Sequence, residues 1–264
     1  EDIGSGDITA QLIADDTLAK AQVISREKAI LCGTAWFEEV FKQLDNQVQI
    51  TWHALEGETI SPEQLLCELT GRARILLTGE RTALNFLQLL SGTASKVQDY
   101  VKAVSDTKAK ILDTRKTIPG LRQAQKYAVR CGGGTNHRMG LYDAFLIKEN
   151  HILAAGSITQ AVATARNYAA LLPVEVEIES IEQIKEALRA GADRLLLDNF
   201  TLPQLHDAVT LVQNQVELEA SGGVTLESIR AIAETGVNFI SVGAVTKDVQ
   251  AVDLSMRILE TEKG

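Results

Sequence analysis

The chain has 264 residues, of which 45% are hydrophobic and 23% charged, a composition typical of a folded globular protein rather than a disordered one. Its formal net charge of -9 repels nucleic acid and anionic lipid, so any anion site must be a local cluster of Lys and Arg. No apolar run approaches the roughly 18 residues of a membrane span, and three cysteines without a C-x-x-C pair are typical of reduced thiols. We therefore predict a cytoplasmic protein with neither a membrane nor a nucleic-acid partner.

The N-terminal residues predict the first part of an α+β domain. The start, EDIGSGDIT, lacks an initiator methionine, so a short preceding piece is expected to be missing. Alternating β-branched residues predict strands over 19–33 and 48–60. Between them, the amphipathic segment 34–44 predicts a helix.

The domain continues with a further strand region and a long helix. Residues 65–78 predict a strand pair or one bent strand. The pattern over 78–104 predicts a helix with Thr78 as its N-cap. Gly92 is expected to break or bend this helix. We place this sandwich-like α+β domain at residues 1–105, joined by a C-terminal helix over 252–264.

From Lys108 onward, short runs rich in Val, Ile and Leu alternate with amphipathic segments, which is the pattern of a βα repeat with a parallel sheet. Six strands can be identified: KILD, AFLI, VEVEI, RLLLD, VELEA and FISV. A closed barrel of this kind needs eight strands. We therefore predict an open, incomplete α/β barrel of six to seven parallel strands over 106–251, with a doubly wound sheet as the alternative.

Polar or small residues end each strand of this repeat, and they recur at steps of roughly 21 to 29 residues between Lys148 and Gly243. Because the carboxyl ends of parallel strands meet at one rim, these residues predict an active site there. They are Arg115 and Lys116, Lys148, Glu177, Asp198, Ser221 to Gly223, and Gly243.

Cations dominate the first part of this rim. Arg115, Lys116, Arg138 and Lys148 are expected to converge there with His137. Any one of them alone fits a scattered surface cation, but the set beside strand ends predicts a site for a multiply charged anion.

Two carboxylates, Glu177 and Asp198, end neighbouring strands on the same rim. They predict a divalent metal that bridges through water to phosphate oxygens of a substrate. Salt bridges to the nearby lysines are the alternative. Glu175 and Glu179 share the face of Glu177 by alternation, so the pattern alone does not select Glu177.

The last two strands end in ASGGVT and SVGAVT. Exposed backbone N–H groups at Ser221 to Gly223 and Val242 to Ala244 predict a phosphate cradle, although a lone SGG is more often a turn. Gly132 to Gly134 fit flexible closure over the site as well as anion binding. His53, His151 and His206 have no ligand-like spacing, and Cys131 with His137 is insufficient for zinc. No G-x-S-x-G, Walker or G-x-G-x-x-G motif is present.

Taken in order, the motifs resemble one known family. GERTALNF, LDTRKTIPGLR, GGGTNHRMGLYDAFLIKENH, VEVEIES, LLLDN, ASGGV and SVGA occur at the spacing of quinolinate phosphoribosyltransferases and cover nearly the whole chain. The resemblance implies a sandwich domain and an incomplete barrel in a homodimer or a larger assembly of dimers. It also implies transfer of a phosphoribosyl group to quinolinate with loss of carbon dioxide, a step of NAD biosynthesis.

The resemblance further implies roles for individual residues. Arg115, His137, Arg138 and Lys148 would hold the two carboxylates of quinolinate, and Arg81 of the partner subunit would complete the site. Thr114 and Lys116 would stand between quinolinate and phosphoribosyl pyrophosphate. Catalysis would depend on four residues: Lys116, Lys148, Glu177 and Asp198. Glu177 and Asp198 would face the ribose and magnesium pyrophosphate, and a final set would cradle the 5-phosphate: Ser221, Gly222, Gly223, Val242, Gly243 and Ala244.

Three alternatives stay open from the residues themselves. A related phosphoribosyltransferase could act on another pyridine carboxylate, although the number of cations favours a dicarboxylate. A barrel lyase could use Lys148 as a Schiff base, and such a lysine should be buried. A non-catalytic module could bind the anion without chemistry.

Overall fold

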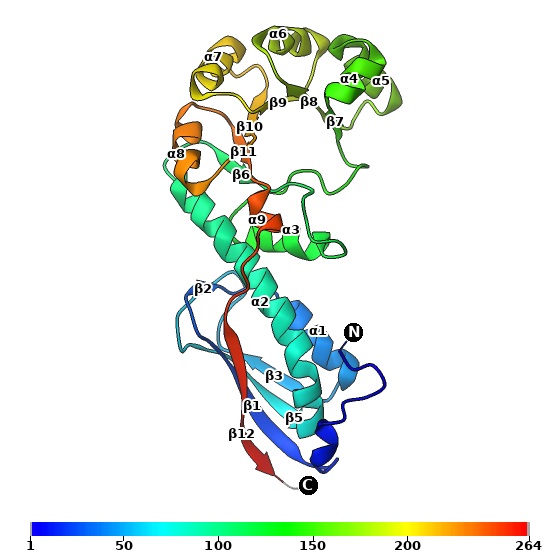
Figure 1. Cartoon of the computed structure of the whole chain (residues 1–264), viewed down its shortest axis with the longest axis vertical. Helices are drawn as coiled ribbons and strands as arrows, with labels where there is room; N and C mark the ends of the chain where they lie inside the picture. The colour runs from blue at the N-terminus through cyan, green and yellow to red at the C-terminus, as the bar shows by residue number, and fades with distance from the viewer. Residues whose placement is uncertain (1, 263–264) are drawn as a thin grey trace. The chain divides into compact units, whose positions relative to one another are not determined.

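The computed structural model describes residues 2–262, which form two compact units (Figure 1). Unit 1 contains the residues up to Lys96 and those from Val249 onward, and unit 2 contains Val97–Asp248. The chain leaves unit 1 within helix α2 (Ala73–Ala103). Although α2 has 31 residues, neither it nor any other helix in the described residues is long and apolar enough to cross a bilayer.

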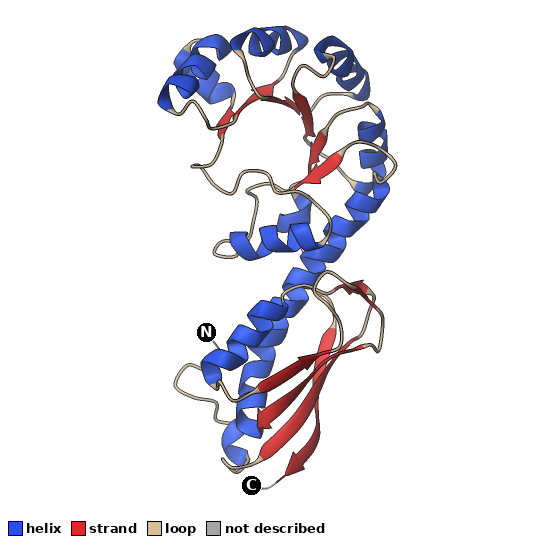
Figure 2. Ribbon diagram, turned by 180° about the vertical axis from the view of Figure 1, so that it is seen from behind, coloured by secondary structure: helices blue, strands red, loops and turns tan. Residues whose placement is uncertain are grey.

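Unit 1 is built on a four-stranded antiparallel sheet in the order β12-β1-β5-β3. A 3-10 turn, η1 (Ala10–Leu12), precedes it, and α1 (Thr34–Leu44) and the first part of α2 cover one face of the sheet (Figure 2). The strands are β1 (Leu18–Ser25), β3 (Gln49–Trp52), β5 (Leu65–Arg72) and β12 (Leu254–Glu262), with a separate pair of β2 (Ala29–Ile30) and β4 (Thr59–Ile60). Phe37, Phe41 and Leu87 are fully buried or nearly so in this core.

The C-terminal helix predicted over 252–264 is wrong, because this segment forms β12 along the edge of β1. Leu254 and Met256 alternate with less buried neighbours, and both enter the core of unit 1. The residues of this segment are acceptable helix formers in isolation, but pairing with β1 satisfies their backbone and buries the alternate side chains. Residues 263 and 264 lie outside the described residues.

The long helix also differs from its prediction. α2 begins at Ala73, so the segment after β5 is helical rather than a second strand, and Thr78 is not its N-cap. The Thr78 hydroxyl instead donates to Oδ2 of Asp7 at 3.0 Å. Gly92 does not interrupt the helix. A Cβ at Gly92 would overlap the backbone carbonyl oxygen of Gln250, so this glycine permits close packing of two chain segments.

Unit 2 contains six parallel strands in the order β6-β11-β10-β9-β8-β7. They are β6 (Lys110–Leu112), β7 (Phe145–Ile147), β8 (Val174–Ile178), β9 (Arg194–Asp198), β10 (Glu217–Ser221) and β11 (Phe239–Ser241). Across the sheet, β7 to β11 follow one another in chain order, and β6, the first strand of the unit, pairs with β11, the last. The predicted open barrel is therefore confirmed, with its gap between β6 and β7, and the doubly wound alternative is wrong.

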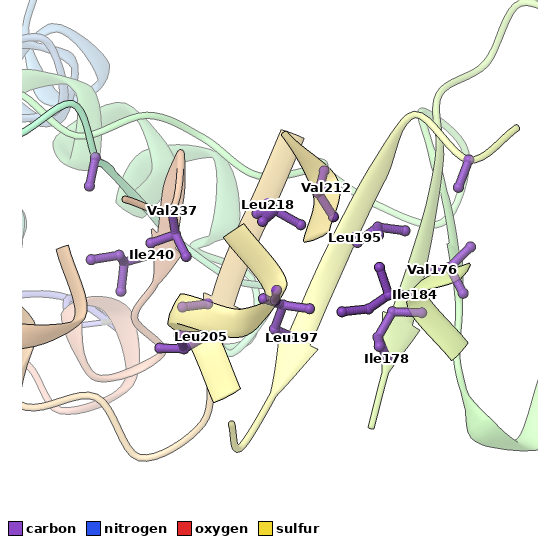
Figure 3. Close-up of a cluster of buried hydrophobic side chains, with 14 of the residues drawn as sticks. Val176, Ile178, Ile184, Leu195, Leu197, Leu205, Val212, Leu218, Val237 and Ile240 are labelled. Atoms are coloured by element: carbon purple, nitrogen blue, oxygen red, sulfur yellow. The ribbon is translucent and has the colours of Figure 1, made fainter. Parts of the chain in front are cut away.

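The helices of unit 2 follow the strands along the chain. They are α3 (Arg122–Cys131), α4 (Glu149–Ala155), α5 (Ile158–Tyr168), α6 (Ile181–Ala190), α7 (Leu202–Val212), α8 (Leu226–Glu234) and α9 (Ala244–Lys247). Those from α4 to α8 lie outside the curved sheet (Figures 1 and 2). Side chains on the outer face of the strands pack against them, as Val176, Leu197 and Leu218 do beside Ile184 and Leu205 (Figure 3). Because side chains alternate along a strand, the intervening residues point to the inside of the barrel.

Candidate active site

A cavity of about 910 Å³ opens at the carboxyl ends of the strands, and all of its lining residues belong to unit 2. The structure brings together there every residue predicted for the site except Arg81. These are Thr114, Arg115, Lys116, His137, Arg138, Lys148, Glu177, Asp198, Ser221, Gly222, Gly223, Val242, Gly243 and Ala244. Arg81 is exposed on α2 in unit 1.

Strand alternation explains how the polar residues reach this cavity. Val174, Val176 and Ile178 of β8 face the helices, so Glu175 and Glu177 face inward. In the parallel register Glu177 lies beside Leu196 of β9, and both line the cavity. The same alternation brings Asp198 and Ser221, which pair across β9 and β10, to its mouth. One face of the sheet therefore supplies the acidic side of the site.

The cationic side comes from loops that fill the gap in the barrel. Arg138 is half-buried, and its Nη1 donates to the carbonyl oxygen of Ala144 at 3.2 Å. Burial lowers the pKa of the Arg138 guanidinium below its usual value, and the nearby charge of Arg115 acts in the same direction. Two guanidinium groups that repel each other in a partly dry site form a strong receptor for a bound anion.

His137 is tied to the protein through both ring nitrogens. Its Nδ1 accepts the backbone N–H of Arg138 at 2.7 Å, so the ring proton is assigned to Nε2. Nε2 faces two buried carboxylates, lying 3.0 Å from Oε2 of Glu175 and 3.5 Å from Oε2 of Glu219. These contacts at both ring nitrogens fix the orientation of the imidazole in the cavity wall.

Glu175 and Glu219 were not among the predicted site residues. Glu219 is fully buried, and burial together with the adjacent Glu175 carboxylate raises its pKa well above the ordinary value. Burial also opposes ionisation of Glu175, but the hydrogen bond from His137 and the charge of Arg194 act against it, and the pKa of Glu175 lies below its ordinary value. Of the two neighbouring carboxyls, Glu219 is therefore the one that is harder to ionise.

Lys148 and the two rim carboxylates form the opposite wall. Nζ of Lys148 lies 2.6 Å from Oε2 of Glu177, and Oδ2 of Asp198 accepts from Nδ2 of Asn199 at 2.8 Å. The salt bridge from a lysine to Glu177, which was the alternative to a metal-binding role, is thus present. Carboxylate oxygens that line an open cavity are also the ligands that Mg²⁺ prefers, so the donor set fits this ion.

Glycines shape the end of the cavity that β10 and β11 form. Gly222 and Gly223 have φ of 99° and 57°, which favours residues without a Cβ. At Gly243 a Cβ would lie 3.0 Å from Cδ of Lys116, so the missing side chain leaves room for the lysine stem. In contrast, the run from Gly132 to Gly134 is absent from the cavity lining within the described residues. It ends α3, where Gly134 packs against Val97 and Val129.

Comparisons with known proteins decide the family. A family model described as quinolinate phosphoribosyl transferase, C-terminal domain, matches residues 93–257, and the corresponding N-terminal domain model matches residues 7–91. The chain belongs to the quinolinate phosphoribosyltransferase family. The resemblance seen in the motifs is therefore confirmed.

Individual relatives of this family match over most of their length. The solved nicotinate-nucleotide pyrophosphorylase of Francisella tularensis is 50% identical with a TM-score of 0.95, and the match covers 98% of this chain and 92% of that one. NadC from Streptococcus pyogenes is 39% identical with a TM-score of 0.94, covering 98% and 93%. A protein of Bacillus subtilis named as a probable carboxylating nicotinate-nucleotide pyrophosphorylase is 45% identical over 259 residues, covering 98% and 90%.

The site also contains residues that sequence reasoning on this family member missed. Besides Glu219, the cavity is lined by Tyr100, Leu146, Leu196, Asn199, Val224, Thr225, Ser241, Lys247 and Asp248. Asn199 and Thr225 directly follow strand ends that were already singled out, so their proximity was a usable signal. Tyr100 comes from α2, and nothing in its helical pattern separates it from an ordinary core residue.

The lyase alternative finds no support in the geometry of Lys148. A lysine that forms a Schiff base is desolvated in an apolar pocket. The Lys148 side chain is instead 46% exposed and forms an ion pair with Glu177.

Proposed function

We propose that this member of the family transfers the phosphoribosyl group of phosphoribosyl pyrophosphate to the ring nitrogen of quinolinate and releases carbon dioxide. The products are nicotinate mononucleotide and pyrophosphate, and the reaction is a step of NAD biosynthesis. The observation that carries this proposal is one cavity that brings Arg115, Lys116, Arg138 and Lys148 together with two carboxylates and a glycine-lined end.

Quinolinate, a dianion, fits the cationic wall. Arg115 and Arg138 repel each other until an anion lies between them, and each offers a planar fork that matches a carboxylate. Lys148 supplies a further point charge. His137 lines this part of the cavity with a ring that its neighbours hold in place.

The phosphoribosyl donor fits the remaining space. Backbone N–H groups of Ser221 to Gly223 and of Val242 to Ala244 would cradle its 5-phosphate. Lys116 extends across Gly243 toward this end, and Thr114, whose hydroxyl accepts the Lys116 N–H at 3.1 Å, lies between the two substrates. Glu177 and Asp198 would hold Mg²⁺ through water, and this ion would neutralise the charge of the departing pyrophosphate.

The reaction follows from this arrangement. The lone pair of the quinolinate nitrogen attacks the anomeric carbon, and the bond from that carbon to pyrophosphate breaks with its electron pair on the leaving oxygen. Glu177 and Asp198 would offset the positive charge that develops on the oxocarbenium-like ribose, while Lys116 and Lys148 would offset the negative charges of the departing pyrophosphate and of quinolinate. Carbon dioxide then leaves, and the electron pair of the broken bond stays on the ring carbon, where the adjacent positive nitrogen stabilises it. That carbon takes up a proton from water.

The proposed working form is a homodimer in the cytoplasm, either alone or within a larger assembly of dimers. Arg81 of the partner subunit would add a cation to each cavity, since Arg81 is an exposed arginine of unit 1 and the cavity lining comes from unit 2. Three cysteines, an odd number, fit a reducing compartment.

The direct test is turnover with purified chain, Mg²⁺ and the donor, in parallel with quinolinate and with nicotinate. We expect carbon dioxide and mononucleotide from quinolinate alone. Arg138→Ala should raise the quinolinate KM and cost about 2 to 5 kcal/mol of binding, because the partner charge is left unpaired. Turnover of nicotinate without quinolinate, or an unchanged quinolinate KM in Arg138→Ala, would overturn the assignment.

The shared site has its own test. Arg81→Ala and Lys148→Ala should each be inactive alone, because each damages every site of its dimer. Mixed after unfolding and refolding together, half of the dimers carry both chains, and one of their two sites is intact, so about 25% of the wild-type activity should return. No recovery in samples that contain mixed dimers would exclude the contribution of Arg81 across the interface.

A further inference from the structure

A buried ion pair stands behind the loop that carries His137 and Arg138. Lys126, on α3, and Asp113, directly after β6, have side chains that are 1% and 0% exposed. Nζ of Lys126 lies 2.6 Å from Oδ1 of Asp113. Neither residue is part of the cavity lining, so the pair has no place in the substrate contacts proposed above.

Both residues of the pair form hydrogen bonds with the backbone of the loop. Nζ of Lys126 also donates to the carbonyl oxygens of His137 and Arg138, both at 2.8 Å, which uses all three of its hydrogens. Asp113 accepts the backbone N–H of His137 at 2.8 Å and the side-chain amide of Asn136 at 2.6 Å. Residues 136–138 form no helix or strand, so regular backbone hydrogen bonds do not fix this loop. The bonds to Lys126 and Asp113 fix it instead.

A buried ion pair of this kind adds little to the free energy of unfolding. Moving both charges into the interior costs free energy that their attraction recovers only partly, and apolar replacements of similar volume are often as stable. Burial raises the pKa of the Asp113 carboxyl even though Lys126, Asn136 and His137 all act to lower it, which is the sign of that cost. What the pair adds is a fixed position for the loop.

The loop needs such an anchor because its arginine is repelled. Arg138 is partly desolvated and lies near the charge of Arg115, so a mobile loop would turn its guanidinium toward water. A receptor for a dianion works best when its cations are already in place before the anion arrives. Lys126 and Asp113 oppose the repulsion between Arg138 and Arg115 because their hydrogen bonds fix the backbone of residues 137 and 138.

We propose that Asp113 and Lys126 are positioning residues that hold Arg138 in the anion site and thereby set the affinity for quinolinate. This inference rests on the proposed function for the identity of the ligand. The positioning of residues 136–138 can be measured without it.

The experiment compares Asp113→Asn and Lys126→Met with wild type and with Lys185→Met, which removes an exposed lysine of α6 as a control. Asparagine keeps the shape and one oxygen of Asp113, but it removes the charge and turns an amide N–H₂ toward Asn136. We expect the quinolinate KM to rise tenfold or more in both variants, while the donor KM changes less than about twofold. The His137 amide should also exchange with solvent deuterium faster than in wild type.

The outcomes separate the claims. An unchanged quinolinate KM with unchanged exchange at 136–138 in Asp113→Asn would overturn the inference. Equal increases in both KM values would also overturn it, because they indicate a general loss of the folded cavity. If Lys126→Met does not fold, Asp113→Asn decides alone. If wild type releases no carbon dioxide from quinolinate, the proposed function fails, and the exchange data then decide whether the pair anchors the loop.

Discussion

Gly222→Ala probes the phosphate end of the site at a position where the structure specifies the clash. A Cβ at Gly222 would overlap Oδ1 of Asn199 and lie 3.0 Å from its backbone nitrogen. The φ of 99° adds backbone strain, for which about 1–2 kcal/mol is typical, and overpacking adds about 1–3 kcal/mol. If the free chain relieves this strain by moving the turn, donor binding must restore the original geometry, so up to about 2–5 kcal/mol, or roughly 30-fold to several thousand-fold, is lost from kcat/KM for the donor.

The clash also reaches a carboxylate of the site. Asn199 donates its backbone N–H to Ser221 at 2.9 Å and its side-chain amide to Asp198 at 2.8 Å. Displacing Asn199 therefore disturbs the residue proposed to face the ribose and Mg²⁺. Binding of quinolinate in the absence of the donor should stay near the wild-type value, since its cations lie on other loops.

Gly223→Ala is the matched control. Gly223 also has a positive φ, of 57°, but a Cβ there meets nothing within 4 Å. It should lose only the strain of about 1–2 kcal/mol, or roughly five- to thirtyfold. Steady-state kinetics with varied donor and calorimetric titration with quinolinate give both quantities. Equal losses in the two variants would refute the role of Asn199, and a normal donor KM in Gly222→Ala would refute the phosphate cradle itself.

Three further perturbations have defined outcomes. The pKa of Glu219 is raised, so its ionisation favours unfolding as pH rises above about 4.3; the Tm of wild type minus the Tm of Glu219→Gln should fall with rising pH, and a constant difference would contradict the raised pKa. Gly92→Ala should lose about 1–3 kcal/mol in urea unfolding through overlap with Gln250, whereas helix propensity alone would make it more stable. Chelation of Mg²⁺ should abolish turnover but not quinolinate binding, and added Mg²⁺ should restore turnover; activity that survives chelation would remove the metal from the proposal.

The predictions from sequence succeeded where one periodicity governs a segment. β8 to β11 alternate with amphipathic helices, and in a parallel sheet this alone brings the strand ends to one rim. The residues at the strand ends, such as Asp198 and Ser221, could therefore be found without the structure. The predictions failed where a distant segment decides. β12 is a strand because β1 offers an edge, and Gly92 is a glycine because Gln250 passes against it.

The alternation of side chains along a strand shows which residues face the inside of the barrel, but not how far below the rim each one lies. Glu175 and Glu177 share one face of β8, and two residues along a strand amount to about 6.6 Å. That step separates a carboxylate that pairs with Lys148 at the cavity from one that is buried against His137. The difference arises because His137 arrives from a loop on the far side of the barrel gap, held there by Asp113 and Lys126. A single strand pattern contains no record of that loop, so a residue's role at the rim depends on contacts that only the folded barrel brings together.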